Sequence, residues 1–129
     1  RGYFYIVGRM KDMIRRSGEN VAAREVEAVL RQLPQVDEAA AVPVPDPVRG
    51  EEIKVYVVLR AGFDPSNVPP YVIVSHCEVN LARFKLPRYI AYHHQLPKTP
   101  TGKIAKKLLL QEATDLRLGA FDRVEGCWR

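Results

Sequence analysis

Two short segments combine glycine with clustered cationic side chains, which is typical of sites that bind anions. The first spans residues 8–20 and carries Arg9, Arg15 and Gly18. The second, residues 97–107 (PKTPTGKIAKK), places Lys103 directly after a turn that contains proline and glycine. Glycine allows the backbone to approach a ligand closely, and cationic side chains attract phosphates and carboxylates. We therefore expect both segments to be candidate sites for an anionic ligand.

Each segment also has an ordinary structural interpretation. Residues 8–20 fit a basic β-hairpin with a glycine turn, and Lys103 fits a solvated lysine near a helix N-terminus. The helix dipole disfavours a cation at that end, and an anion bridging Lys103 and the helix start would offset the penalty. A Walker P-loop is excluded because Gly102-Lys103 is followed by Ile104 and has no upstream glycine.

Other residue types give no pattern of a metal centre or a nucleophile. The three histidines have no carboxylate or cysteine at ligand spacing. Ser17 and Ser75 lack a local histidine partner. Cys77 falls on the apolar side of a predicted helix, which favours a buried free thiol. We expect Trp128 to pack against other side chains rather than stack on nucleic-acid bases.

The helices and strands that position the two segments are predicted from hydrophobic periodicity and from the prolines and glycines that mark turns and element ends. Strands are predicted at 3–7, 10–16, 36–44, 53–60 and 89–93, and helices at 22–33, 70–86 and 103–118. Residues 17–20 are predicted as a loop, and Pro43 and Pro45 favour either an edge position for the third strand or the end of that strand. The order β-β-α-β-β-α-β-α predicts an α+β domain, in which about three helices pack on a small mixed sheet with a β-hairpin. Residues 119–129 show no clear period.

The fourth strand gives the clearest pattern. Two sets of side chains alternate along residues 53–60 and are expected on opposite faces: Ile53, Val55, Val57 and Leu59 on one, and Lys54, Tyr56, Val58 and Arg60 on the other.

Length and composition limit the class of protein. A chain of 129 residues with 47% hydrophobic and 27% charged residues fits one ordinary globular domain. The formal charge of +5 favours an anionic partner. No apolar run approaches the ~18 residues of a membrane span, and the start shows no signal peptide, so a cytoplasmic location is the expectation. Because the chain starts without methionine and within a strand-like pattern, we expect a fragment of a longer chain.

Four segments, in order, resemble motifs of the adenylate-forming enzymes. Residues 2–14 (GYFYIVGRMKDMI), followed by 17–21 (SGENV) and 25–27 (EVE), resemble the hinge and glycine-loop motif of that family. Residues 96–104 (LPKTPTGKI) resemble its C-terminal lysine motif. Between them, residues 44–51 (VPDPVRGE) and 84–87 (FKLP) fit the family's order. The family comprises acyl-CoA synthetases, luciferases and peptide-synthetase adenylation domains, and the resemblance covers residues 2 to about 110.

The resemblance implies that residues 1–118 are the small C-terminal domain of such an enzyme, with residues 119–129 as a tail that matches no motif. A large N-terminal domain would hold the acyl pocket and the phosphate loop, and would bind most of the Mg²⁺ that accompanies ATP. ATP and a carboxylate first give an acyl-adenylate and pyrophosphate. The small domain then rotates, and the CoA thiol attacks the adenylate. The resemblance therefore implies ATP, CoA and a carboxylic acid as ligands, and no activity of the fragment alone.

The resemblance also implies residue roles. Lys103 matches the lysine that stabilises charge during adenylation, with Lys98 as the second candidate for that role. Lys11 takes the hinge position, and the residues implied at the nucleotide are Arg9, Arg15 and Asn20. The residues implied at CoA are Ser17, Gly18, Glu19 and Arg49. No residue is implied as a metal ligand.

The acid cannot be predicted from these residues, although the sequence GENV at 18–21 favours an acyl-CoA ligase over luciferase, of the crotonobetaine/carnitine or fatty-acid type. A second hypothesis stays open: a stand-alone basic module that binds nucleic acid or nucleotide-like anions without catalysis. The coding sequence upstream of residue 1 distinguishes them, since only the first hypothesis requires a contiguous adenylation domain.

Overall fold

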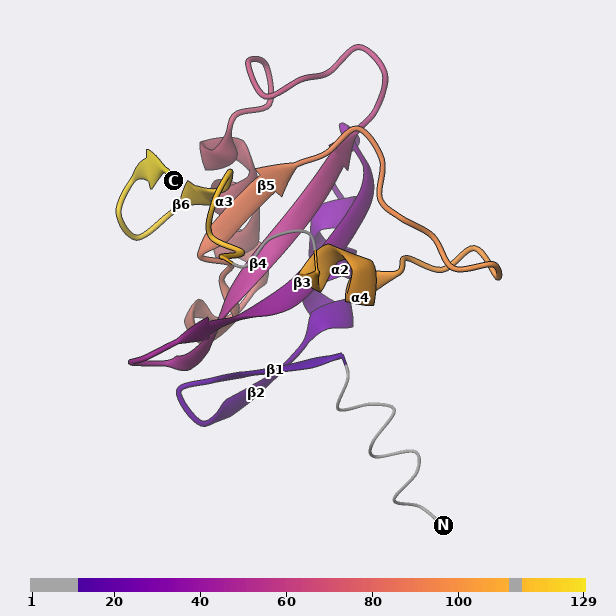
Figure 1. Cartoon of the computed structure of the whole chain (residues 1–129). Coiled ribbons are helices and arrows are strands. Elements are labelled where there is room, and N and C mark those ends of the chain that lie inside the picture. The colour runs from indigo at the N-terminus through magenta and orange to yellow at the C-terminus, as the bar shows by residue number, and fades with distance from the viewer. Residues whose placement is uncertain (1–11, 112–114) are drawn as a thin grey trace.

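The described part of the chain, residues 12–111 and 115–129 of a computed structural model, forms a mixed seven-stranded sheet (Figure 1). Strands β3 (Val36–Asp46) and β4 (Gly50–Leu59) pair antiparallel along their lengths, and β5 (Tyr89–Tyr92) runs parallel to β4. The β1 (Met13–Arg16) and β2 (Glu19–Ala22) hairpin joins one end of β4 through the pairing of Arg16 with Gly50.

Helices cover both faces of this sheet. Helix α2 (Ala23–Arg31), helix α3 (Pro70–Asn80) and the short 3₁₀ helix η1 (Arg83–Lys85) connect the strands. Helix α4 (Lys106–Leu110) is a single short turn of helix on the opposite face, turned toward the viewer in Figure 1. None of the described helices is long and apolar enough to cross a membrane.

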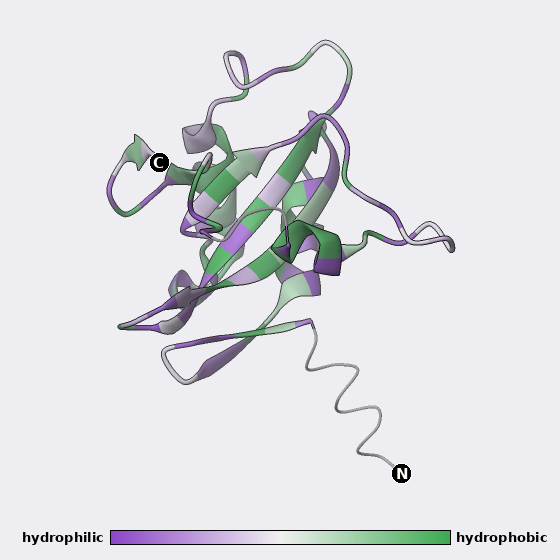
Figure 2. Ribbon diagram, viewed as in Figure 1, coloured by the Kyte–Doolittle hydropathy of each residue, from purple (hydrophilic) through white to green (hydrophobic). Residues whose placement is uncertain are grey.

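The alternation of side chains along β4 builds two apolar layers (Figure 2). Ile53, Val55 and Val57 pack with the buried side chains of α2 and α3. Tyr56 and Val58 belong to a second cluster on the other face, with Leu109 of α4 and side chains from residues 89–120. The two predicted faces of this strand are therefore confirmed, and β4 is the central strand that both layers share.

Most predicted elements are confirmed, including the α+β class, the α2 helix and the position of β3, which pairs with β4 alone among the described strands. The strand predicted at 3–7 lies outside the described residues. Helix α2 spans 23–31 rather than 22–33, β3 continues to Asp46, and β4 spans 50–59 rather than 53–60. Three further predictions were wrong. Residues 19–20 belong to β2 rather than to a loop. Helix α3 ends at Asn80 because Leu81 is extended, with φ −127° and ψ 149°. The last predicted helix is limited to Lys106–Leu110 in the described residues, since Ile104 pairs with Lys98 and residues 115–118 form turns.

The C-terminal residues form a hairpin although their sequence has no clear period. Strand β6 (Phe121–Asp122) pairs with β5, and β7 (Cys127–Trp128) pairs with β6. The Trp128 ring lies edge-on to Phe121, with centroids 5.6 Å apart, and tilted toward Tyr92 at 6.2 Å. These contacts extend the sheet to the end of the chain.

Candidate functional site

The lysine-bearing turn is a small hairpin closed by its own hydrogen bonds. Lys98 and Ile104 form an antiparallel bridge, and the Thr99 amide donates to the Lys103 carbonyl at 2.7 Å. The Lys103 amide donates back to the Thr99 hydroxyl at 3.2 Å, while Gly102 turns the chain with φ +89°. Residues with a side chain rarely adopt that φ, whereas glycine does so readily, so Gly102 allows the chain to turn here. Lys103 is exposed beside it, on a segment that projects from the sheet.

The position of Lys103 corrects the helix-dipole argument. Helix α4 begins at Lys106 rather than at Lys103, and it has only five residues. The unfavourable dipole contact predicted for Lys103 is therefore absent from this turn. The constraint on Lys103 comes instead from the closed hairpin, which fixes its backbone independently of the helix.

A groove of about 830 Å³ lies against this turn. Its charged lining residues are the acidic Asp12, Glu27 and Glu38 and the basic Lys98, Lys103, Lys106 and Lys107. Gly102, Ile104 and Leu110 complete the lining. Lys98 Nζ pairs with Glu38 Oε2 at 2.6 Å, so its charge is directed at the wall of the groove. The geometry therefore favours Lys103 over Lys98 for contact with an anion in the groove.

Lys106 anchors the lysine segment to the rest of the domain, which sequence reasoning missed. Its Nζ lies 2.7 Å from Glu27 Oε2 and 3.2 Å from Asp12 Oδ1. Glu27, which is 7% exposed, also accepts a hydrogen bond from the Ala41 amide at 2.8 Å. The sequence signal was a glutamate beside the apolar stripe of α2, but its partner is 79 positions away and becomes apparent only from the fold.

The glycine hairpin brings together residues that the sequence separates by 32 positions. Ser17 and Gly18 form its two-residue turn, with φ 53° and 82°. The Ser17 amide donates to the Arg49 carbonyl at 2.7 Å, and Arg49 Nη1 donates to Ser17 Oγ at 3.2 Å. Asp46 fixes the turn that carries Arg49. Its carboxylate accepts hydrogen bonds from the Val48 and Arg49 amides at 3.0 and 2.8 Å. The Arg49 bond contributes most to lowering the pKa of Asp46.

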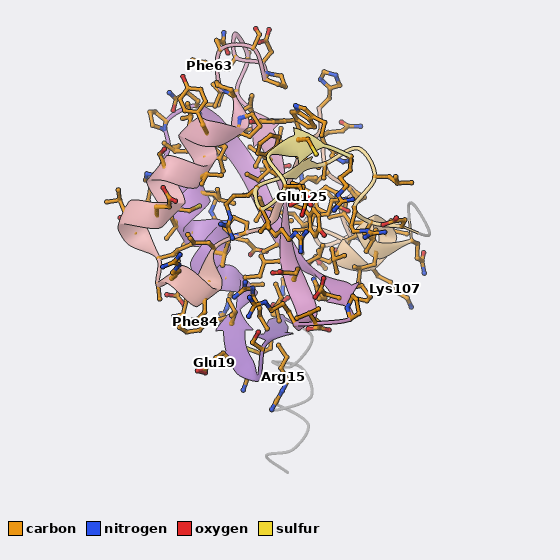
Figure 3. All side chains as sticks on the ribbon, turned by 90° about the vertical axis from the view of Figure 1, so that its left-hand side faces the viewer. Arg15, Glu19, Phe63, Phe84, Lys107 and Glu125 are labelled. Atoms are coloured by element: carbon orange, nitrogen blue, oxygen red, sulfur yellow. The ribbon has the colours of Figure 1, made fainter. Side chains whose placement is uncertain are left out.

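The other predicted residues of this hairpin lie on its strands. Arg15 pairs with Asn20 in the β1–β2 register, and the Arg15 amide donates to Glu51 Oε1 at 2.8 Å. Arg15, Asn20 and Glu19 are exposed. Arg15 and Glu19 lie near the free end of the hairpin in Figure 3, well away from Lys107. Arg9 and Lys11 lie outside the described residues.

The two candidate segments are therefore brought to different places on the domain. In Figure 1 the β1–β2 hairpin lies at the lower edge, while the segment preceding α4 projects to the right. The groove at Lys103 includes Asp12 at the start of β1 but none of residues 15–20. A single ligand in this groove would contact Lys103 without contacting the Ser17–Gly18 turn.

The remaining reactive side chains have structural surroundings. Cys77 is fully buried, as predicted, and burial raises the pKa of its thiol to about 12, so the thiolate needed for nucleophilic attack is not formed at neutral pH. The described residues contain no group of three or more His, Cys, Asp or Glu side chains arranged to hold a metal ion.

Comparison with known proteins identifies the family to which this α+β domain belongs. The family described as "AMP-binding enzyme C-terminal domain" matches residues 25–103, and the chain belongs to this family.

Relatives and solved structures agree with this family. The chain is 43% identical over 112 residues to sulfoacetate–CoA ligase of Cupriavidus necator, covering 87% of this chain and 21% of the relative. It is 43% identical over 121 residues to acetyl-coenzyme A synthetase of Bacillus subtilis, covering 94% and 21%. A fatty acyl CoA synthetase structure from Mycobacterium tuberculosis superposes with a TM-score of 0.75 at 39% identity, covering 82% of this chain and 20% of that one. The chain thus spans about a fifth of the length of these proteins.

Proposed function

We propose that residues 1–118 form the mobile C-terminal domain of an AMP-forming acyl-CoA ligase. The partner domain is a large N-terminal adenylation domain on the same polypeptide, which binds the acid, ATP and most of the associated Mg²⁺. The complete enzyme joins a carboxylic acid to ATP, releasing pyrophosphate, and then transfers the acyl group from AMP to CoA. Membership of the family and the similarity to CoA ligases of which this chain matches about a fifth support the proposal.

The observation that carries this proposal is the separation of the two candidate segments. Lys103 lies on its own closed turn, whereas Ser17 and Arg49 meet at a hairpin elsewhere on the domain. A rigid domain with two such surfaces can present one to the active site during adenylation and the other during thioester formation. Rotation about Lys11, beside the described residues, would exchange them.

In the adenylation step, the carboxylate oxygen attacks the α-phosphorus and pyrophosphate leaves. The Lys103 ammonium stabilises the negative charge that develops on the carboxylate and phosphate oxygens. Because its turn is closed by backbone hydrogen bonds, the lysine backbone is held in place before the reaction. Arg9, Arg15 and Asn20 contact the nucleotide in this proposal.

In the thioester step, the CoA sulfur attacks the acyl carbonyl and AMP leaves. Ser17, Gly18 and Glu19 line the path of the pantetheine arm, where the absence of a side chain on Gly18 leaves the backbone accessible. A Cβ built on Gly18 meets no atom within 4 Å in the domain, so the space beside it is open. Arg49, held to Ser17 at 3.2 Å, supplies positive charge for the CoA nucleotide.

The acid is selected by the large domain in this proposal. Relatives that are about 40% identical to this segment carry the names of ligases for sulfoacetate, oxalate, 4-hydroxybutyrate and crotonobetaine/carnitine. Such varied names over one shared segment indicate that the segment does not determine the acid. A fatty acid or a crotonobetaine-like acid is our first choice for assay, and the cytoplasm, where ATP and CoA are available, is the proposed location.

The test is acyl-CoA formation by the full-length protein and by the 129-residue chain. With ATP, Mg²⁺, CoA and a panel of carboxylic acids, the full-length protein should produce AMP, pyrophosphate and one acyl-CoA. The 129-residue chain should produce none. Acyl-CoA formation by the short chain would contradict the proposal, as would an upstream coding sequence without an adenylation domain, which would favour the stand-alone anion-binding module.

A further inference from the structure

The first strand of the C-terminal hairpin, β6, carries a carboxylate with many partners, that of Asp122. The Asp122 side chain is 0% exposed. Its Oδ1 accepts Arg88 Nε at 3.0 Å and the Val124 and Glu125 amides at 3.0 and 3.2 Å. Its Oδ2 accepts Arg88 Nη2 at 3.1 Å and the Arg129 Nε and Nη2 atoms at 3.0 and 2.8 Å. A buried carboxylate held by two guanidinium groups fixes the orientation of both.

Arg88 connects this hairpin to the centre of the sheet. Its Nη1 atom lies 3.6 Å from Glu52 Oε2 and 3.8 Å from Asp46 Oδ1. Its backbone is also fixed, because the Arg88 amide donates to the Ile53 carbonyl and the Arg123 amide donates to the Arg88 carbonyl, at 2.8 and 2.7 Å. A fourth carboxylate, Glu125, has its Oε2 atom 4.0 Å from Arg88 Nη2. The guanidinium therefore bridges four carboxylates that belong to three segments, β3, β4 and the C-terminal hairpin.

The same chain of charges reaches the glycine hairpin. Glu52, whose side chain is 3% exposed, accepts Arg16 Nε at 2.6 Å, and Arg16 directly precedes Ser17. On the second branch, Asp46 fixes the turn from which Arg49 bonds to Ser17. Both branches from Arg88 thus end at the Ser17–Gly18 turn, more than 100 positions before Asp122 in the sequence.

We propose that the C-terminal hairpin is a positioning element for the CoA-binding turn, with Asp122 and Glu52 as its positioning residues. Asp122 orients Arg88, Arg88 and Arg16 share Glu52, and Arg16 fixes the base of the Ser17–Gly18 turn. This inference rests on the proposed function for its consequence, CoA binding, but the positioning itself is measurable without any ligand. It gives residues 119–129 a role that neither the sequence motifs nor the family match over 25–103 includes.

Hydrogen exchange on the 129-residue chain tests whether the contacts from Asp122 through Arg88 and Glu52 position the Ser17–Gly18 turn. The Ser17 amide, bonded to the Arg49 carbonyl, reports the turn, and Trp128, the single tryptophan, reports the hairpin by fluorescence. Asp122→Asn should accelerate exchange at Ser17 about ten-fold or more and shift the Trp128 spectrum. Glu52→Gln should accelerate exchange at Ser17 by a similar factor and leave the Trp128 spectrum unchanged.

The control variant is Asp37→Asn, which removes an exposed carboxylate paired with Arg60. It should leave both reporters at their wild-type values. The reference amide is that of Leu81, bonded to the Cys77 carbonyl at the end of α3. It reports any loss of overall stability, and exchange at Ser17 should accelerate more than exchange at Leu81 in Asp122→Asn and in Glu52→Gln. Equal acceleration at Ser17 and Leu81 would indicate a general loss of stability and overturn the proposal, as would wild-type exchange at Ser17 in Asp122→Asn.

Should Asp122→Asn fail to fold, Arg129→Gln removes two of the bonds to Asp122 and retains Arg88. Wild-type exchange at Ser17 in both Arg129→Gln and Glu52→Gln would overturn the inference. In the full-length protein, Glu52→Gln should raise KM for CoA several-fold with KM for ATP unchanged. Faster exchange at Ser17 without a change in KM for CoA would retain the positioning and contradict the CoA role of the turn.

Discussion

Two residues with positive φ, Ser17 at 53° and Gly18 at 82°, explain why the glycine hairpin turns where it does. Paired positive φ angles match the twist of a two-residue β-hairpin, and glycine adopts them without steric cost. Gly18 thus has a structural reason to be glycine as well as the proposed role at the pantetheine arm. Any substitution there changes stability and ligand access together, so a control glycine is needed to separate the two effects.

Gly18→Leu in the full-length enzyme should slow thioester formation while adenylation stays nearly unchanged. The side chain would enter the open space proposed for the pantetheine arm, and the positive φ should cost about 1–2 kcal/mol of stability. Gly62→Leu is the matched control, since Gly62 has φ +92°, also has no atom within 4 Å of its Cβ position, and lies in the loop before α3. Pyrophosphate release, acyl-CoA formation and melting curves measure the three quantities.

The two leucine variants should lose similar stability and differ in thioester formation. Equal rates of acyl-CoA formation in both variants would show that Gly18 serves only the turn.

At the scale of elements, the sequence predicts most where local pattern and packing agree. The alternation along residues 53–60 corresponds to a strand buried on both faces, and the helical stripe before Pro34 corresponds to α2. Local pattern fails where tertiary contacts decide. The last helix is short because Ile104 pairs with Lys98 before the helix starts, and residues 119–129 are ordered by Asp122 and its arginine partners.

The candidate site also has a part that the sequence predicts and a part that only tertiary contacts decide. Resemblance to family motifs predicts Lys103 and the 17–20 segment as site residues, and the structure brings Ser17 and Arg49 together. Their role at CoA stays a proposal. The resemblance does not predict the pairing of Lys106 with Glu27, because nothing in the local sequence of α2 distinguishes a buried, paired glutamate from a solvated one.

Lys106→Met should destabilise the 129-residue chain by about 2 kcal/mol, because Glu27 would keep a largely buried charge without its cationic partner. In the double variant Glu27→Gln/Lys106→Met the loss should be smaller than the sum of the two single losses. Urea unfolding of the four proteins in this cycle measures the coupling. Additive losses would mean that the 2.7 Å contact contributes no stability and that α4 is held by its apolar side chains alone.

At the scale of the whole molecule, Asp122 links the C-terminal hairpin to the stability of the sheet in acid. Burial by itself would raise the pKa of this carboxyl, but hydrogen bonds from Arg88, Arg129 and the Glu125 amide outweigh it and lower the pKa to about 2. A carboxyl whose pKa in the folded chain is lower than its ordinary value of 3.8 stabilises the fold above pH ~4 and loses that contribution as the pH falls toward 2.

The wild-type chain should therefore exceed Asp122→Asn in free energy of unfolding by roughly 2 kcal/mol at pH 6. The difference should shrink between pH 4 and pH 2, where protonated aspartate resembles asparagine. Urea unfolding at several pH values measures it. A difference that stays constant down to pH 2 would show that the loss in Asp122→Asn comes from packing rather than from the charged hydrogen bonds.

The proposed rotation of the whole domain, which would exchange its two surfaces at the active site, predicts that the two sites act in different half-reactions. Lys103→Ala in the full-length enzyme tests this most directly, with Arg60→Ala, an exposed arginine paired with Asp37, as control. Adenylation, measured as carboxylate-dependent pyrophosphate release, should fall by about 10²–10³ because one positioned positive charge is removed from the transition state. Formation of acyl-CoA from added acyl-adenylate should stay close to the wild-type rate. Equal losses in both half-reactions, or wild-type pyrophosphate release, would contradict the assignment of Lys103 to adenylation.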